Sequence, residues 1–467
     1  IRLATVLMKK KITYRIEEDS LGKIKVPKDA LYGAQTQRAI DNFQIGNDWF
    51  YPTFIQSLAM LKGACALANY KSKVIDRRLA SSIYECALQI NNNIADYYEH
   101  FPAPLYQTGS GTSINMNMNE VLANLVSKRL KRKVHPNDDI NKSQSSNDVI
   151  PTTINISCIR AEAELVDSMI FLDHVLEKKS NELRGVIKSG RTHLMDAVPI
   201  SFGEEIEIWR HLLQGAYSTL DTACYEALSI PIGGTAIGTG LNAPKGFDKK
   251  VCVELNKIYK NLKLKFIPLP MKGQMISSQD HILTMSSSLL RISSSITKIC
   301  NDLRWMNSGP ISGLSEITLK PLQPGSSIMP GKINPVMPEA ILMAMTRVAG
   351  NNSAISISCM SGNFQLNTML PIIAHNVIES FELITDSCLA LASTIEGFKV
   401  NKENIKNNLE KNPIVATKLN EVIGYDLASK IVKAAYKSNK SIIDVAEKMT
   451  NLSRSQLEKL LDPKKLI

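Results

Sequence analysis

Apolar residues recur at helical spacing over stretches that are much longer than an average helix. Between residues 152 and 189 the chain contains no proline and a single glycine, Gly185, while Ile159, Ala163 and Val166 mark one apolar stripe. Apolar residues three and four positions apart lie on the same face of a helix. The pattern therefore predicts one very long amphipathic helix.

Both ends of this helix carry recognisable signals. The run Ser145–Asp148 offers capping side chains, and Pro151 suits a first helical turn because a nitrogen there needs no acceptor. Gly190 is expected to end the helix, since glycine readily adopts the left-handed backbone conformation of a helix terminus.

The same pattern predicts three further long helices. One covers 276–307 and another 365–396. The third opens with Asn334 as cap, with the following proline in its first turn, and runs to Gly350. Alternation typical of strands is confined to short pieces near 12–27.

Long helices with broad apolar faces indicate an all-α bundle and not an α/β fold. We expect an N-terminal mixed, mainly helical domain at 1–145 and a central long-helix bundle at 146–395. A small C-terminal helical domain is expected at 396–467, where the composition becomes rich in Lys and Asn. The broad apolar stripes also suggest burial against partner chains.

The chain has 467 residues and a formal net charge of +11, from 55 Lys and Arg against 44 Asp and Glu. Such an excess of positive charge can bind a nucleic acid, or it can steer small anionic substrates toward a site. The basic residues are spread along the chain, which favours solvated helix faces over a nucleic-acid surface.

Eight cysteines form no CxxC pair, and several lie in apolar helical contexts such as that of Cys65. Buried free thiols in a reducing compartment fit this usage. No apolar run reaches about 18 residues, so no membrane span is expected. Met8, followed by three lysines, is a plausible natural start. A cytoplasmic location is expected, with the mitochondrial matrix as the alternative.

The loop Pro324–Pro335 combines two hydroxyls, one ammonium, one amide and two glycines between prolines. Glycine lets backbone N–H groups approach a ligand closely. Ser326 and Ser327 can donate or accept protons, and Lys332 is a compact cation suited to a carboxylate. The loop looks built for an anion, although an ordinary mobile loop is the plainer reading.

Four other polar clusters fall at predicted breaks between helices. The clusters are Gln107–Thr112, His135–Asp138, Ser145–Asn147 and Gly190–His193. Each also has a purely structural interpretation, which is, in the same order, a glycine-rich linker, a capped turn, a plain helix cap and a structural histidine.

No pattern for a metal or a nucleotide is visible. The sequence has no HExxH and no Cys/His pairs at ligand spacing. The glycines of Gly233–Gly240 lack the GxGxxG spacing of a dinucleotide site. We expect neither a metal nor a cofactor.

Taken in order, these clusters resemble the fumarase/aspartase superfamily. Gly325–Asn334 looks like its signature loop. Gln107–Asn119, His135–Asn147, Gly190–His193 and Gly233–Asn242 are similar to its other shared segments. The resemblance covers nearly all of the chain.

Within the superfamily the chain looks most like the class II fumarases. Thr108, Ser110 and Thr112 are typical of fumarases, and so is Gly331. Val336–Pro338 departs from that pattern and resembles aspartases more closely.

The resemblance implies a three-domain, mainly helical protomer. It also implies a homotetramer around a helical core, with each active site drawing on three chains. The implied activity is the reversible hydration of fumarate to L-malate through an aci-carboxylate, on a small C4 dicarboxylate and without a cofactor.

The resemblance also assigns roles to single residues. Ser326 is the base that removes the proton, and His193 with Glu339 acts on the departing hydroxyl through water. A second, non-catalytic dicarboxylate site would comprise His135, Pro136, Asn137 and Asp138. Substrate contacts would come from Ser110, Gly111, Thr112, Ser145, Ser146, Asn147, Thr192, Ser327, Lys332, Ile333 and Asn334.

Aspartate ammonia-lyase is the close alternative, because it shares the carbanion chemistry and differs in the leaving group. Argininosuccinate and adenylosuccinate lyases fit the first two clusters poorly. A non-enzymatic nucleic-acid-binding protein is supported only by the net charge of +11.

Overall fold

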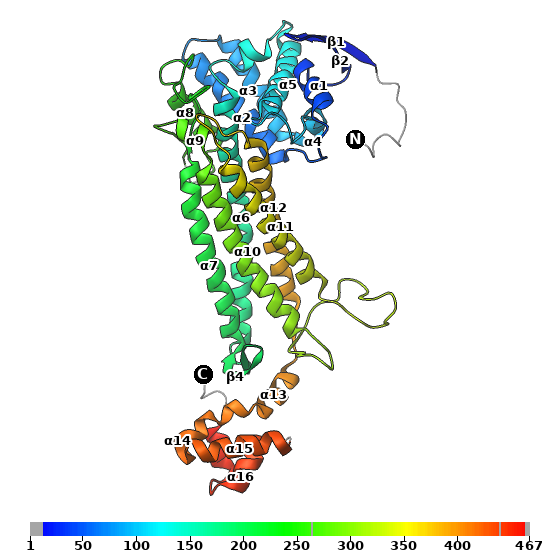
Figure 1. Cartoon of the computed structure of the whole chain (residues 1–467), viewed down its shortest axis with the longest axis vertical. Helices are drawn as coiled ribbons and strands as arrows, with labels where there is room; N and C mark the ends of the chain where they lie inside the picture. The colour runs from blue at the N-terminus through cyan, green and yellow to red at the C-terminus, as the bar shows by residue number, and fades with distance from the viewer. Residues whose placement is uncertain (1–12, 263–264, 439, 463–467) are drawn as a thin grey trace. The chain divides into compact units, whose positions relative to one another are not determined.

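The computed structural model describes residues 13–262, 265–438 and 440–462, and most of them are helical (Figure 1). The expected start at Met8 lies outside these residues. The elements before the first long helix are β1 (Tyr14–Asp19), β2 (Gly22–Pro27), α1 (Ala34–Asn42), α2 (Pro52–Lys71), α3 (Arg77–Asn92), α4 (Ile94–Tyr97), η2 (Tyr98–His100), α5 (Thr112–Leu130) and η3 (Pro136–Ile140).

Among the described residues, five helices exceed twenty residues. They are α6 (Ser146–Leu183), α7 (Phe202–Ala227), α10 (Asp280–Met306), α11 (Val336–Cys359) and α12 (Leu370–Gly397). The expected all-α fold is confirmed, and so are the predicted helices near 276–307 and 365–396. No helix of the described part of the chain is long and apolar enough to cross a membrane.

The predicted end of the first long helix at Gly190 is wrong. Helix α6 ends at Leu183, the backbone N–H of Val186 turns back to the Leu183 carbonyl at 3.0 Å, and Gly185 lies within that turn. Val186 and Ile187, which follow, are β-branched, a type that favours strands. The chain then forms the antiparallel hairpin of β3 (Ile187–Thr192) and β4 (Met195–Ser201).

Gly190 instead serves the pairing of this hairpin. It lies in β3 at a register shift, where a Cβ atom would approach the Val198 carbonyl oxygen to 2.7 Å. Pro151 is also displaced from its predicted position, because it is the sixth residue of α6.

The predicted end of α11 at Gly350 is wrong as well, since the helix continues to Cys359. A glycine inside a helix costs about 1 kcal/mol relative to alanine. Packing outweighs that cost, because the next residue, Asn351, is buried and donates to Ser380 Oγ of α12 at 3.2 Å.

The chain divides into two compact units, each made of three segments. Unit 1 contains the described residues of 1–166 with 217–293 and 346–385, and unit 2 contains 167–216, 294–345 and those of 386–467. Each of the five long helices contributes one stretch to each unit.

In unit 1, α2 packs against both α3 and α8 (Phe247–Ile258), and most of its side chains are buried. The long-helix stretches of this unit are joined by polar contacts between neighbours. Tyr217 Oη donates to Glu162 at 3.0 Å, and Asn352 donates to Ser286 at 3.0 Å. The short elements β5 (Ser229–Ile230), β6 (Ile267–Pro268) and α9 (Gly273–Ser277) complete it.

In unit 2, the indole N–H of Trp209 donates to Asp302 Oδ2 at 3.0 Å, which joins α7 to α10. The β3–β4 hairpin packs against α13 and η4. The remaining elements are β7 (Ile317–Thr318), β8 (Lys399–Val400), α13 (Lys402–Lys411), η4 (Pro413–Leu419), α14 (Asn420–Ile423), α15 (Tyr425–Ser438), α16 (Ile442–Met449) and α17 (Arg454–Leu460).

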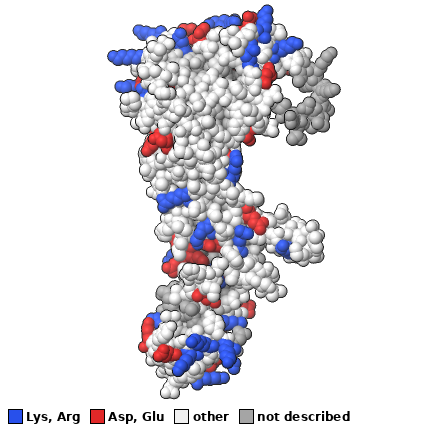
Figure 2. Space-filling view, viewed as in Figure 1, with Lys and Arg blue, Asp and Glu red and all other residues white. Residues whose placement is uncertain are grey.

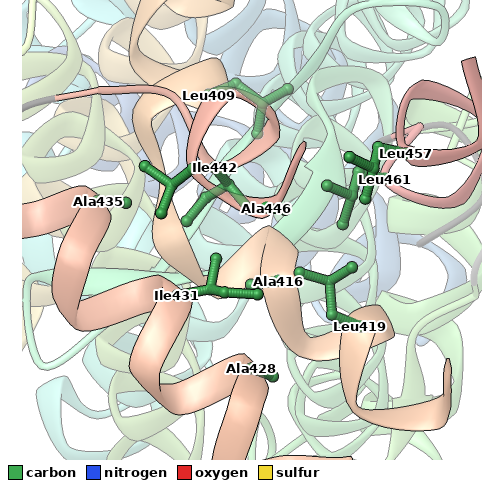
Figure 3. Packing of buried hydrophobic residues seen from close by; sticks show 11 residues of the cluster. Leu409, Ala416, Leu419, Ala428, Ile431, Ala435, Ile442, Ala446, Leu457 and Leu461 are labelled. Atoms are coloured by element: carbon green, nitrogen blue, oxygen red, sulfur yellow. The ribbon is translucent and has the colours of Figure 1, made fainter. Parts of the chain in front are cut away.

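The C-terminal helices enclose a small hydrophobic cluster of their own. Figure 3 shows Ile431 of α15 pointing toward Ala416, among side chains from the neighbouring helices. Its buried members are Leu409, Ala416, Leu419, Ala428, Ile431, Ala435, Ile442, Val445, Ala446, Leu457 and Leu461.

Replacing Ile431 by alanine should destabilise these helices by about 2–5 kcal/mol, because the side chain is fully buried and its loss leaves a cavity. Urea unfolding followed by far-UV circular dichroism measures the change. Tyr436→Ala on the same helix is the control, since Tyr436 is 65% exposed and should cost less than about 0.5 kcal/mol. Equal effects of the two variants would contradict the assignment of Ile431 to a packed core.

Candidate functional site

The turn at Ser145–Asn147 caps the start of α6. Ser145 Oγ accepts the N–H of Asn147 at 3.2 Å, and the Ser145 N–H donates to Asp148 Oδ1 at 2.9 Å. The capping predicted for Ser145 and Asp148 is therefore confirmed. The side chains of the turn remain half-buried at a helix N-terminus, where N–H groups and the helix dipole favour an anion.

The Asp148 carboxylate also holds a second loop against this turn. Its Oδ2 atom accepts the N–H groups of Gly233 and Thr235 at 2.9 and 2.8 Å. Asn147 adds a bond from its amide to the Ala236 carbonyl at 2.8 Å. Burial raises the pKa of Asp148 to about 6, although these backbone N–H groups oppose that shift.

Beneath the same turn lies a buried ammonium, that of Lys62 on α2. Its Nζ atom donates to Asn141 Oδ1 at 2.8 Å and to Gln144 Oε1 at 3.0 Å. Asn141 Oδ1 also accepts from the amide of Asn115, which in turn donates to Ser146 Oγ at 2.9 Å. Burial lowers the pKa of Lys62 to about 7, because the charged form is desolvated.

The turn at Ser110–Thr112 lies close to the start of α6. Gly111 has φ +72°, and a Cβ atom there would meet Ile150 at 2.9 Å. Ser110 Oγ and Thr112 Oγ1 lie 2.8 Å apart. Two of the predicted substrate-binding clusters thus meet within unit 1.

The cluster at His135–Asp138 forms a capped turn at the start of η3. His135 Nδ1 accepts the N–H groups of Asn137 and Asp138 at 3.3 and 3.1 Å. A nitrogen that accepts carries no proton, so the 3.3 Å approach of Asp138 Oδ2 to Nδ1 is not an ion pair in this tautomer. His135, Asn137 and Asp138 are exposed.

In unit 2, backbone contacts close the base of the 324–335 loop. The Gly325 N–H donates to the Lys332 carbonyl at 3.0 Å, and the Asn334 amide donates to the Gly325 carbonyl at 2.7 Å. A Cβ atom at Gly325 would lie 2.2 Å from the Lys332 oxygen, so only glycine fits there. Lys332 and Ile333 line one side of a cavity of about 800 Å³ that the end of α10 also lines.

Two backbone amides are directed at the Ser326 hydroxyl. The N–H groups of Ile328 and Met329 donate to Ser326 Oγ at 3.1 and 3.0 Å. Hydrogen bonds to the charged form of a group favour that form. Ser326 is half-buried, whereas Ser327 and Lys332 are exposed.

His193 occupies a strained position at the tip of the β3–β4 hairpin. Thr192 pairs with Met195, so His193 and Leu194 form a two-residue turn with φ +55° and +62°. Such a turn favours Asn-Gly, and a non-glycine residue in this region costs on the order of 1–3 kcal/mol. The prediction that His193 follows a helix end is wrong.

Glu339 lies in the first turn of α11, as predicted. Among the described residues of this single chain, no hydrogen bond or ion pair joins His193 to Glu339, and their pairing stays a prediction. No group of three or more His, Cys, Asp and Glu side chains in the described part of the chain could hold a metal ion.

Sequence reasoning missed the buried supports of these turns. Lys62 interrupts the otherwise apolar run from Leu58 to Ala68, and a lone cation inside such a run was the available signal. Asn141 and Gln144 gave no comparable signal, since amides are common in loops.

Removing the Lys62 charge should change the pH dependence of stability. The native pKa near 7 lies below the unfolded value of 10.5, so the unfolded chain binds more protons between these values. Wild-type stability should therefore rise with pH across this window relative to Lys62→Met, by at most about 1.4 kcal/mol per pH unit. Denaturant unfolding at pH 7, 8.5 and 10 tests this, and a constant difference would contradict a depressed pKa.

Comparison with known proteins identifies the family. The family described as lyase matches residues 22–350, and the family described as fumarase C C-terminus matches residues 415–467. The chain is 44% identical to fumarate hydratase class II 2 of Pseudomonas aeruginosa, over 97% of this chain and 98% of that protein. It is 42% identical to fumarate hydratase class II of Xylella fastidiosa, over 96% and 94% of the two chains.

Solved structures agree with the sequence matches. The crystal structure of recombinant class II fumarase from Schistosoma mansoni superposes with a TM-score of 0.92 at 35% identity, covering 97% of this chain and 99% of that one. The fumarate lyase:delta crystallin structure from Brucella melitensis bound to cobalt has a TM-score of 0.91 at 37% identity, with the same coverage. The superfamily resemblance is confirmed. The chain belongs to the class II fumarate hydratase family.

Proposed function

We propose that this protein catalyses the reversible hydration of fumarate to L-malate. The observation that carries the proposal is the pair of backbone N–H groups at the Ser326 hydroxyl. A serine is a weak base on its own, and these donors stabilise the alkoxide that could remove a proton from carbon. The named activity of the relatives supports the same reaction.

In the direction from malate to fumarate, Ser326 takes a proton from the carbon next to a carboxylate. The product of that step is a dianionic aci-carboxylate, whose extra charge needs stabilisation. Lys332 and Asn334 are proposed to hold one end of the substrate, and Thr112, Ser145 and Asn147 the other. Further contacts are proposed from Ser110, Gly111, Ser146, Thr192, Ser327 and Ile333.

The departing hydroxyl then needs a proton. His193, paired with Glu339, is proposed to supply it through a water molecule as the general acid. The carbon–oxygen bond breaks, and the electron pair of the aci-carboxylate forms the new double bond. In the reverse direction the same groups add water to fumarate.

We also propose that the chain works as a homotetramer. Each active site would combine segments from three chains. Figure 2 shows charged side chains gathered over the N-terminal elements and the C-terminal helices, with fewer over much of the long helices. Large apolar side chains exposed on the long helices support burial against partner chains: Ile170, Phe171, Ile208, Leu212, Met343, Ile357 and Leu389.

Three further assignments belong to this proposal. A three-domain division at 1–145, 146–395 and 396–467 stays a prediction. The turn at His135–Asp138 is proposed as a second dicarboxylate site, because its exposed side chains sit at a helical turn with a proline start. All eight cysteines are buried free thiols, which supports a reducing compartment such as the cytoplasm.

Purified protein given L-malate should produce the ultraviolet absorbance of fumarate, and L-aspartate should give no such rise. Ser326→Ala and His193→Asn should each lower kcat by about 10²–10⁴-fold, since each removes a proton-transfer group. Ser438→Ala is the control and should retain wild-type turnover, because Ser438 is exposed at the end of α15 and its hydroxyl bonds only within that helix. Near-normal turnover in Ser326→Ala would remove that residue from its role, and turnover of L-aspartate alone would replace the proposed reaction.

Mixing the two inactive variants tests whether sites are shared. In a random mixture of Ser326→Ala and His193→Asn chains, about a quarter of the sites would combine a wild-type serine from one chain with a wild-type histidine from another. Co-expressed variants should therefore recover roughly that fraction of activity, and native mass spectrometry should show a tetramer. No recovery in confirmed mixed tetramers would mean that both residues come from the same chain.

A further inference from the structure

Unit 2 contains a buried cluster of four charged side chains that the proposed mechanism does not use. Glu316 lies at its centre, with Oε1 at 2.6 Å from Arg191 Nη2 and Oε2 at 2.6 Å from Lys188 Nζ. Lys188 also approaches Glu205 Oε2 to 2.6 Å and lies 4.8 Å from the centre of the Phe202 ring. The side chains of Lys188 and Glu316 are 1% and 3% exposed.

The deep burial of Lys188 and Glu316 determines whether this cluster contributes to stability or to positioning. Moving charges out of water costs several kcal/mol for each ion, so a buried ion pair adds little net stability compared with an apolar core. Its geometry is strongly enforced, however, because removing one partner leaves the other charge unpaired. Such a cluster therefore fixes position more than it adds stability.

The backbone around Glu316 is also fixed on both sides. Its N–H donates to the Met306 carbonyl at 2.8 Å, and its carbonyl accepts the Asn401 N–H at 2.9 Å. The carboxylate thus projects from a rigid segment that joins the end of α10 to β8. The Glu316 carboxylate therefore holds the side chains of Lys188 and Arg191 in place.

Those two cations belong to the strand that carries His193. Lys188 and Arg191 both lie in β3, and Arg191 precedes His193 by two residues. His193 itself has a left-handed backbone, which persists only where the surroundings over-determine it. The ion pair between Arg191 and Glu316 therefore anchors β3 two residues before this turn.

We propose that Glu316 is a positioning residue, which acts through Arg191 to hold the turn bearing His193 in the place where the departing hydroxyl of malate must be protonated. This inference rests on the proposed function. Glu316 itself is not proposed to touch a reacting atom. Its effect should fall on cleavage of the carbon–oxygen bond and not on removal of the proton by Ser326.

This division can be measured because the two bonds break at different residues. In D2O, malate that has lost and regained its C3 proton acquires deuterium, whereas fumarate forms only when the hydroxyl also departs. Initial rates, taken before fumarate accumulates and its rehydration adds deuterium to malate, are read by NMR of the malate pool and by ultraviolet absorbance of fumarate on one sample. Their ratio separates an effect on His193 from an effect on Ser326.

Glu316→Gln keeps the volume of the side chain and removes its charge. Fumarate formation should fall by at least about tenfold, while deuterium exchange into unreacted malate should fall by less than about threefold. Glu316→Asp, which keeps the charge, should restore part of the lost rate. Arg191→Lys should also lower fumarate formation more than deuterium exchange. This variant replaces Glu316→Gln in the test if Glu316→Gln does not assemble.

Asp173→Asn is the matched control. Asp173 receives two bonds from Arg210, at 2.9 and 3.0 Å, in another ion pair of unit 2 that does not involve the hairpin. This variant should leave the ratio of the two rates unchanged. An equal fall of both rates in Glu316→Gln, or no fall in either, would overturn the positioning role.

Hydrogen–deuterium exchange of the amides in 187–201 provides a readout that needs no turnover. These amides should exchange faster in Glu316→Gln than in the wild type, and at the wild-type rate in Asp173→Asn. If the wild type fails to convert malate, the proposed reaction fails and the amide exchange alone decides whether Glu316 holds the hairpin. Unchanged exchange in Glu316→Gln would then overturn the inference.

Discussion

The hydrogen bonds of the Asp148 carboxylate are the constraint on which the arrangement of unit 1 depends. One oxygen accepts the Ser145 N–H and the other accepts two N–H groups from the loop at 233–235. A single buried side chain therefore fixes the start of α6 and a segment far away in sequence. Desolvation opposes its ionised form, and three backbone donors oppose desolvation. Without those donors the turn at Ser145–Asn147 would lose its shape.

Unit 2 follows the same physical logic with different residues. The turns and loops that we propose to bind the substrate consist largely of exposed or half-buried residues, and such segments are weakly ordered by themselves. Beneath them lie charges that are almost completely buried, Lys62 and Asp148 in one unit and Lys188 and Glu316 in the other. Buried charges tolerate few arrangements, because any that separates the partners leaves a charge unpaired in a poorly polarisable interior. The positions of the proposed substrate-binding side chains are thus fixed by buried charged groups, whose burial is unfavourable by itself.

Sequence reasoning identified four of the five long helices and the polar clusters because these leave local signals, but it did not predict α7. Apolar periodicity marked α6, α10 and α12, and the loop around Lys332 stood out by its composition alone. The hairpin around His193 was missed, since two short strands after a helix have too few residues to establish alternation. The supports under each site were missed for a different reason. Lys188 and Glu316 lie 128 positions apart, and no pattern along the chain announces that they will meet.

The closed base of the 324–335 loop has a consequence for how the basic oxygen of Ser326 could be switched. The contacts of Gly325 with Lys332 and Asn334 pin the two ends, so the segment between them behaves as a short tethered flap. Ser326 and its two donors, the N–H groups of Ile328 and Met329, all lie within this flap, so they would move together. Opening the flap would carry the hydroxyl away from a bound substrate with its hydrogen bonds intact. The serine would keep its activation in both positions, and its distance from the substrate alone would switch the reaction on or off.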